Sequence, residues 1–170
     1  VLPMVYPMTV AGLKRELPIC KVNDNLYIAG FVIFGDQELT VACARELLKR
    51  APEYDYIITA EAKGIPLAHE MARQAGDAKY ILARKAPKLY MTEVFSSTVK
   101  SITTAKEQTL YLDTADAELM KGKKILIVDD VIPTLRNALR SKFARAKNTA
   151  VIIPKTEITK PASGSIPVMK

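Results

Sequence analysis

One segment near the end of the chain, Lys124–Thr134, constrains the fold more than any other. An apolar run, Ile125–Val128, ends in two adjacent carboxylates, Asp129 and Asp130, and an amphipathic pattern follows. Such a run is typical of a strand buried on both faces of a parallel sheet. Open α/β sheets bind ligands at the carboxyl ends of their strands. Two acids at that position suit either the vicinal hydroxyls of a ribose or a divalent cation.

Strand and helix patterns alternate along the rest of the chain. The sequence predicts further strands at Leu26–Phe34, Tyr56–Thr59, Tyr80–Ala83, Leu110–Leu112 and Ala150–Ile153. It predicts helices from an Asp36 N-cap to about Arg50, from Pro66 to about Gln74 with a stop at Gly76, and over Thr134–Ala146. A turn or short helix is expected at Asp113–Met120. The alternation predicts an α/β fold with a parallel sheet that is covered on both faces.

The chain is expected to form a single domain over residues 1–170, with 49% hydrophobic residues to build its core. Residues 1–35 are turn-rich and extended, and residues 36–153 hold the alternating pattern. Within them, residues 84–108 have no firm period and predict a long mobile loop with β-ribbon character. The tail, residues 154–170, is only weakly structured by its pattern.

Composition narrows the class of partner. The formal net charge of +7 favours an anionic partner, either phosphorylated small molecules or nucleic acid. Nucleic acid is less favoured, because the basic residues are scattered and no DNA- or RNA-binding motif occurs. Cys20 and Cys43 are too few for a disulfide framework, which favours a cytoplasmic location. No apolar run approaches the length of a membrane span, so no membrane association is expected.

Read alone, the acid-tipped segment also resembles the opening of a phosphoacceptor receiver domain. In a receiver the acids would hold Mg²⁺ beside an aspartate on a later strand. None of the 40 residues after Asp130 is an aspartate. A receiver therefore cannot be completed, and this interpretation is set aside.

Three motifs in order resemble those of type I phosphoribosyltransferases, in their purine branch. Glu61–Pro66 follows one predicted strand, Ala83–Lys85 follows the next, and Val128–Ile132 follows a long loop. The similarity runs from about Tyr6 to Ile153, and Gly12–Leu26 resembles the small hood that covers the base in that family. The resemblance implies a Rossmann-like parallel-sheet core with an N-terminal hood (residues 1–35) and a flexible lid loop.

The resemblance also implies an activity. Such enzymes transfer ribose 5-phosphate from phosphoribosyl pyrophosphate to a purine ring nitrogen, through an oxocarbenium-like transition state that is stabilised by positioning and electrostatics. Adenine is the leading base, while Ser101–Thr104 lacks a lid glutamate and is closer to xanthine-type enzymes. The alternatives are a xanthine/guanine-type enzyme and a non-catalytic phosphoribosyl pyrophosphate-binding regulator. Mg²⁺ is expected to arrive chelated to the substrate, and a homodimer is expected from the family.

The resemblance assigns roles to individual residues, and each residue also has a plainer interpretation. Asp129 and Asp130 would accept hydrogen bonds from the ribose hydroxyls, or they form a solvated strand end or helix cap. The residues expected to bind the pyrophosphate are Glu61, Ala62, Lys63, Gly64, Arg84, Lys85 and Lys88. They could equally form an ordinary turn with solvated charges. Phe31 and Ile33 would line the base, or they belong to a core strand.

The loop after the acids departs from the family pattern. The family normally has a glycine there, in a loop whose backbone N–H groups wrap the 5′-phosphate at a helix N-terminus. The residues expected to do so here are Pro133, Thr134, Leu135, Arg136 and Asn137. Thr134 fits, but Pro133 has no N–H to donate and Leu135 replaces the glycine. Arg136 could supply compensating charge.

Overall fold

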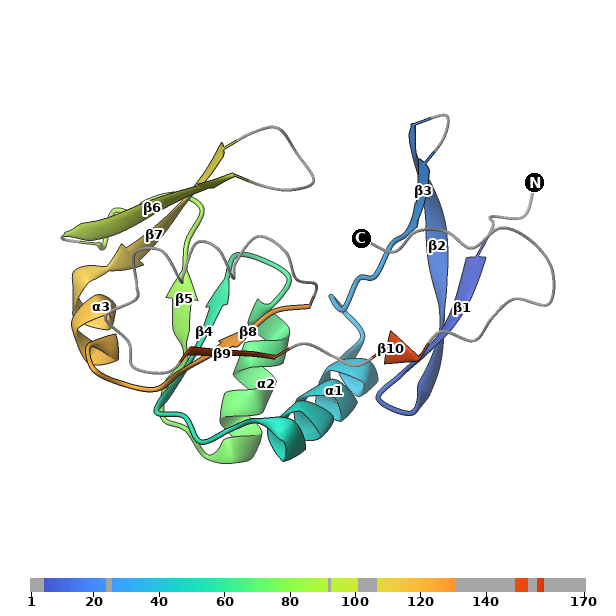
Figure 1. Ribbon diagram of the computed structural model, residues 1–170, viewed down its shortest axis with the longest axis horizontal. Helices are drawn as coiled ribbons and strands as arrows, with labels where there is room; N and C mark the ends of the chain where they lie inside the picture. Colours follow the sequence, from blue (N-terminus) through green and yellow to red (C-terminus); the bar gives the residue numbers. More distant parts are fainter. Residues whose placement is uncertain are drawn as a thin grey trace.

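The computed structural model describes residues 5–23, 26–91, 93–100, 107–130, 149–152 and 156–157. The described part contains a parallel sheet with helices, an antiparallel sheet and a two-stranded ribbon (Figure 1). The predicted helix at 134–146, the loop Pro133–Asn137 and the segment Ser101–Thr104 lie outside the described residues.

The parallel sheet has four strands in the order β5-β4-β8-β9. These are β4 (Tyr56–Ala60), β5 (Ile81–Ala83), β8 (Ile125–Val128) and β9 (Thr149–Ile152). All three neighbouring pairs run parallel. Each residue of β8 is buried, as an apolar strand in the middle of a covered sheet should be. The predicted parallel α/β sheet is therefore confirmed, with the acid-tipped strand in its interior.

Two helices cover one face of this sheet. The first, α1 (Gln37–Arg50), begins where the Asp36 carboxylate accepts a hydrogen bond from the backbone N–H of Leu39. The second, α2 (Ile65–Ala75), ends at Gly76, whose φ of 77° is the left-handed conformation that glycine adopts readily. Both helices match the predicted ones. No helix within the described ranges is long and apolar enough to cross a membrane.

The opposite face is covered by a strand and a short helix. These are β7 (Glu107–Asp113) and α3 (Thr114–Met120), which follow each other in the chain. Their buried side chains pack against side chains on this face of the parallel sheet. The cluster consists of Ile58, Ile81, Ala83, Leu110, Leu112, Met120, Ile125 and Ile127. β7 also pairs antiparallel with β6 (Val94–Lys100) in the ribbon that projects from the sheet (Figure 1). β7 is longer than the predicted strand, and the predicted ribbon character of residues 84–108 is confirmed at β6.

The hood is a second sheet, antiparallel and four-stranded, in the order β10-β1-β2-β3. Its strands are β1 (Val5–Val10), β2 (Leu13–Asn23), β3 (Leu26–Ala29) and β10 (Thr156–Glu157). Ala11 and Gly12 both have positive φ and make the tight turn between β1 and β2.

Two predictions about these parts of the chain are wrong. The strand expected over Leu26–Phe34 ends at Ala29, because the residues after Gly30 leave the ladder and bury Phe31 and Ile33 in the core. The last strand was expected at Ala150–Ile153, yet β10 follows it within the tail and pairs with β1. Such a short strand carries no sequence period, and only its long-range partner stabilises it.

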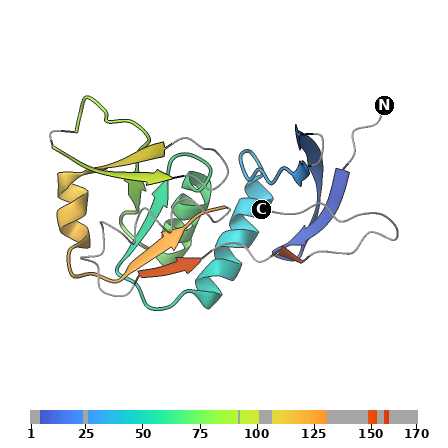
Figure 2. The same ribbon diagram turned by 45° about the horizontal axis from the view of Figure 1, so that its top comes forward.

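The hood packs against α1, which lies between it and the rest of the core in both ribbon views (Figure 1 and Figure 2). Tyr6, Met8 and Val10 of β1 belong to the same buried cluster as α1, α2 and one face of the parallel sheet. Arg15 fixes this contact further, donating from Nε and Nη2 to the two carboxylate oxygens of Asp36 at 2.6 and 3.0 Å. The hood and the start of α1 are thus tied by a bidentate ion pair.

Candidate active site

The three predicted motifs meet at one edge of the parallel sheet. Glu61, Arg84 and Asp129 each follow the last residue of a strand, and those strands are the neighbours β4, β5 and β8. The carboxyl ends of parallel strands lie at the same edge, which is where such sheets bind ligands. The structure therefore brings together motifs that lie up to 68 positions apart, as the difference between 61 and 129 gives.

The acid pair is half-buried. The backbone N–H of Asp130 donates to Oδ1 of Asp129 at 2.9 Å. Oδ2 of Asp130 is buried and has no hydrogen-bond partner among the described residues. Burial, followed by the neighbouring Asp130 carboxyl, raises the pKa of Asp129 to about 7, while the charge of Lys63 acts in the opposite direction. A buried carboxylate oxygen without a donor needs an explanation, and a hydroxyl is one group that would satisfy it.

Gly64 holds the start of α2 against the acid pair. Its φ of −71° is one that any residue adopts, so the backbone does not require glycine. Glycine is required at position 64 because there is no room for a side chain: an added Cβ would lie 2.1 Å from Oγ1 of Thr59 and 3.2 Å from Oδ1 of Asp129. The glycine lets the Glu61–Gly64 loop contact the ends of β4 and β8 directly. Its predicted role, a close approach of backbone to pyrophosphate, stays a prediction.

Glu61 joins this loop to the residues after β5. Its Oε2 accepts a hydrogen bond from the backbone N–H of Lys85 at 2.8 Å, and its Oε1 forms an ion pair with Nε of Arg84 at 3.3 Å. Arg84 is also fixed by its backbone, which exchanges two 2.8 Å hydrogen bonds with Tyr111 of β7. The Glu61 side chain thus orders the neighbouring motif, a function that its sequence position did not reveal. The Glu61–Ala62 peptide bond is cis.

The remaining residues of the predicted pyrophosphate site differ in exposure. Ala62, Lys63 and Lys85 are exposed, whereas Lys88 is partly buried. The backbone N–H of Lys88 donates to Sδ of Met91 at 3.3 Å, which holds the turn after Lys85. Their contact with pyrophosphate stays a prediction.

Phe31 and Ile33 are core residues of the connection between the hood and α1. They are 7% and 0% exposed and belong to the cluster that joins β1 to α1, whereas Val32 between them is 51% exposed. They lie after the end of β3, so the expected core strand at this point is wrong although their burial is correct. Contact with a base stays a prediction. The predicted 5′-phosphate residues Pro133, Thr134, Leu135, Arg136 and Asn137 lie outside the described residues.

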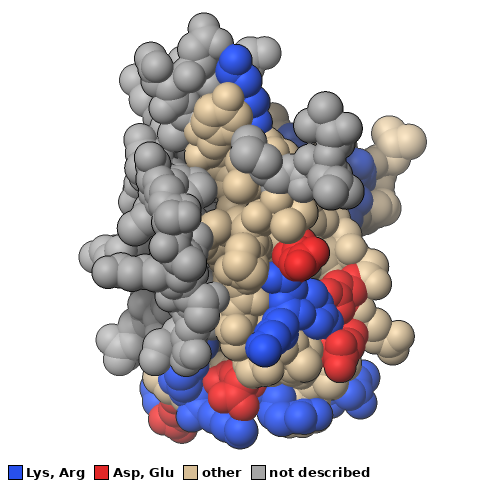
Figure 3. Space-filling view, turned by 90° about the vertical axis from the view of Figure 1, so that its right-hand side faces the viewer, with Lys and Arg blue, Asp and Glu red and all other residues tan. Residues whose placement is uncertain are grey.

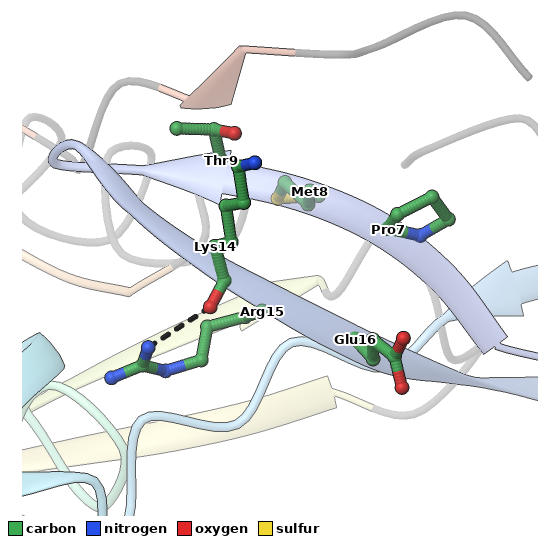
Figure 4. A pocket seen from close by; sticks show the side chains of 6 residues that line it. All are labelled: Pro7, Met8, Thr9, Lys14, Arg15 and Glu16. Atoms are coloured by element: carbon green, nitrogen blue, oxygen red, sulfur yellow. Dashed lines mark hydrogen bonds between the residues drawn. The ribbon is translucent and has the colours of Figure 1, made fainter.

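A separate cavity of about 630 Å³ lies on the hood (Figure 4). Its lining comes from the paired strands β1 and β2: Pro7, Met8, Thr9, Lys14, Arg15 and Glu16. The guanidinium of Arg15 is already bound to Asp36, Glu38 and the carbonyl of Lys14. Seen from the side of the hood, acidic and basic side chains are interspersed, with no uninterrupted basic surface on the part of that face the structure describes (Figure 3).

One residue of the site was not singled out by sequence reasoning. Thr59 is fully buried in β4, and its Oγ1 has no hydrogen-bond partner among the described residues. The signal in the sequence was a hydroxyl within the otherwise apolar strand Tyr56–Ala60, two positions before the Glu61 motif. A buried polar side chain without a partner needs an explanation.

Comparison with known proteins agrees with the geometry. Residues 35–152 match the phosphoribosyl transferase domain. The hypoxanthine/guanine phosphoribosyltransferase of Methanotorris igneus is 34% identical over 162 residues, covering 88% of this chain and 84% of its own. That of Methanococcus maripaludis is 35% identical over 150 residues, covering 82% of this chain and 77% of its own.

Solved structures share the fold. The adenine phosphoribosyltransferase of Thermoanaerobacter pseudethanolicus superposes with a TM-score of 0.63 at 16% identity, over 81% of each chain. That of Trypanosoma brucei, solved with AMP, pyrophosphate and ribose-5-phosphate, superposes with a TM-score of 0.55 at 14% identity, over 81% of this chain and 73% of its own. The chain therefore belongs to the phosphoribosyltransferase family, with the type I, purine-branch fold that its motifs predicted.

Proposed function

We propose that this protein transfers ribose 5-phosphate from phosphoribosyl pyrophosphate to a ring nitrogen of a purine base and releases pyrophosphate. The observation that carries the proposal is the half-buried acid pair at the end of β8, with one buried carboxylate oxygen of Asp130 left unpartnered among the described residues. It lies at the sheet edge that also holds the Glu61 and Arg84 motifs. Membership of the phosphoribosyltransferase family supports the same reaction.

In this reaction the protein mainly positions groups and stabilises charge. Asp129 and Asp130 accept hydrogen bonds from the two ribose hydroxyls, and their negative charge opposes the positive charge that develops on the sugar. The N-terminus of α2 follows the Glu61–Gly64 loop, and the positive end of its helix dipole favours the negative charge of the leaving pyrophosphate. Arg84 adds positive charge, part of which the ion pair with Glu61 offsets. Lys63 and Lys85 supply further exposed cations at this edge.

Mg²⁺ fits this site as a partner of the substrate. Carboxylate oxygens are suitable neighbours for the ion, but the described residues contain no group of three or more acidic, histidine or cysteine side chains that could hold it. We infer that the pyrophosphate, the ribose and water provide most of its ligands. When bound, the ion neutralises the negative charge of the leaving pyrophosphate.

For the base, 6-oxopurines have the better support. The relatives at 34% and 35% identity are named hypoxanthine/guanine phosphoribosyltransferases. The adenine enzymes resemble this chain at 16% and 14% identity, which supports the fold alone. Adenine, the base expected from the sequence, is therefore the second candidate. A cytoplasmic homodimer is proposed on the family resemblance.

The test combines binding with a panel of bases. Calorimetry with phosphoribosyl pyrophosphate and Mg²⁺ should show binding, and chromatography should detect nucleotide from hypoxanthine and guanine with a higher kcat/KM than from adenine or xanthine. Asp130→Asn should weaken binding by roughly 10- to 100-fold, the size of one hydrogen bond to a charged group. Asp116→Asn is the control, because Asp116 lies on α3, outside the three motifs of the site, and pairs with Lys79.

The same measurements decide between an enzyme and a regulator. Binding of phosphoribosyl pyrophosphate without product from any base would leave a non-catalytic binding protein of this fold. Absence of binding would refute both functions. A higher kcat/KM with adenine than with the 6-oxopurines would reverse the assignment of the base.

A further inference from the structure

Thr59 has a buried hydroxyl that the proposed chemistry does not use. Its side chain is 0% exposed in β4, and Oγ1 has no hydrogen-bond partner among the described residues. A buried hydroxyl normally finds an acceptor, because leaving it unpaired is unfavourable. Thr40, the other buried threonine of the described core, follows this rule by donating to the carbonyl of Asp36 at 2.8 Å.

The surroundings of Oγ1 contain a carboxylate. The position that a Cβ on Gly64 would take lies 2.1 Å from Oγ1 of Thr59 and 3.2 Å from Oδ1 of Asp129. The two oxygens therefore share one small space beside a glycine, with no Gly64 side chain between them. The carbonyl oxygen of Val128 borders the same space at 3.3 Å from that position. Both neighbours are acceptors, and the hydroxyl can donate to either.

The acid has capacity for this hydrogen bond. Oδ1 of Asp129 accepts one hydrogen bond, from the backbone N–H of Asp130, and a carboxylate oxygen can accept a second. The charged groups that act on Asp129 are the Asp130 carboxyl and Lys63. The Asp130 carboxyl repels an ionised Asp129. The attraction from Lys63 is screened by solvent, because that side chain is exposed. A hydroxyl donor on the buried side would favour the ionised carboxylate.

We propose that Thr59 is a positioning residue for the acid pair, whose hydroxyl donates to Oδ1 of Asp129 when that carboxylate is ionised. A small rotation of either side chain within the space beside Gly64 forms the bond. The bond holds Oδ1 on the buried side and leaves Oδ2 of Asp129 for a ribose hydroxyl. Thr59 itself touches no substrate atom and acts through Asp129. The substrate part of this inference rests on the proposed function.

The test is a double-mutant cycle between the hydroxyl and the acid. Thr59→Val keeps the shape and removes the donor, and it should weaken phosphoribosyl pyrophosphate binding by roughly 10-fold, the equivalent of one hydrogen bond. Thr59→Ser restores the donor and should bind like the wild type. In the Asp129→Ala background, which has no side-chain acceptor, Thr59→Val should cause no further loss. Thr40→Val is the matched control and should lower stability while leaving affinity unchanged.

A second arm needs no ligand. Urea unfolding at pH 8 of the wild type, both single variants and the double variant should show that the effect of Thr59→Val depends on whether residue 129 is Asp or Ala. If the wild type fails to bind phosphoribosyl pyrophosphate, the proposed function is refuted. The unfolding measurements still test whether Thr59 and Asp129 form a hydrogen bond, because they need no ligand. The inference is overturned if the unfolding effects are additive, as expected when the hydroxyl donates to Val128. It is also overturned if the wild type binds and Thr59→Ser behaves like Thr59→Val.

Discussion

Replacing Gly64 with alanine tests the central packing contact of the site. The added Cβ would lie 2.1 Å from Oγ1 of Thr59, a separation at which one of the two groups must move. It would also lie 3.2 Å from Oδ1 of Asp129 and 3.3 Å from the Val128 carbonyl. The sheet holds the backbone of Thr59 and Val128 in place, so the start of α2 is the part of the backbone expected to shift.

The expected cost follows from two opposing effects. Overpacking by one methyl group in a filled interior costs about 1–3 kcal/mol. Because the φ of Gly64 is −71°, alanine adopts the backbone without strain and restricts the unfolded chain, which returns about 0.4–1 kcal/mol. The net loss should be roughly 1–2 kcal/mol, or a decrease in Tm of about 2–8 °C for a domain of this size. Phosphoribosyl pyrophosphate should bind more weakly, since the shift displaces the loop beside Asp129.

The assay is urea unfolding followed by calorimetry, with Gly30→Ala as the matched control. Gly30 also lacks a positive φ, but a Cβ there would meet its nearest atoms at an ordinary 3.6 Å. Gly30→Ala should therefore change stability by no more than about 0.5–1 kcal/mol. Adding Thr59→Ala to Gly64→Ala removes the closest atom and should recover part of the loss. The reasoning is refuted if both glycine variants are equally stable, or if Thr59→Ala gives no recovery.

Three further predictions concern charged groups and thiols. Asp129→Asn should gain stability relative to the wild type as pH rises from about 4 to 7. Burial raises the pKa of Asp129 in the folded protein, so the folded state keeps a proton that the unfolded chain has lost, and the wild type loses stability across this window by on the order of 1 kcal/mol for each pH unit. Unfolding curves across this pH range measure the difference, and parallel curves for the two proteins would contradict it. Asp36→Ala should lower the free energy of unfolding by about 1 kcal/mol or more, because α1 loses its N-cap and Arg15 loses its ion-pair partner. The loss should appear as a lower urea midpoint, and an unchanged midpoint would contradict both roles of Asp36. A thiol reagent should modify exposed Cys20 in the native protein and buried Cys43, whose pKa is raised to about 11 by burial, only on unfolding; equal rates would refute this.

The parts of the fold that local patterns encode were predictable. The apolar run before Asp129 and the strand at Tyr56 became neighbours in a parallel sheet, with Ile58 opposite Ile127. The helix after Asp36 formed because the cap and the apolar spacing agree. The end of β3 was not predictable from pattern, since the apolar residues continue beyond Ala29 but turn into the core instead of extending the ladder.

The site was predictable at the level of motifs and not of contacts. An acid pair after a buried strand shows in the sequence, as does a glycine that starts a helix. The reason for glycine at position 64 lies in Thr59 and Asp129, which reach it from two different strands. The ordering of Arg84 by Glu61 likewise depends on β4 and β5 being neighbours. Such contacts follow from tertiary packing, and the hydrophobic periodicity of a single sequence does not predict them.

The packing also connects the hood to the acid pair. Val128, the residue before Asp129, belongs to the same buried cluster as Tyr6, Met8 and Val10 of β1. The chain leaves the hood before α1 and returns to it after β9, where Thr156 pairs with Val10. The hood is thus held to the core through its own buried face, through both connections of the chain and through the Arg15 ion pair. Because close-packed interiors transmit small displacements, a change that loosens β1 should move the end of β8, and with it the acids that the proposed reaction needs.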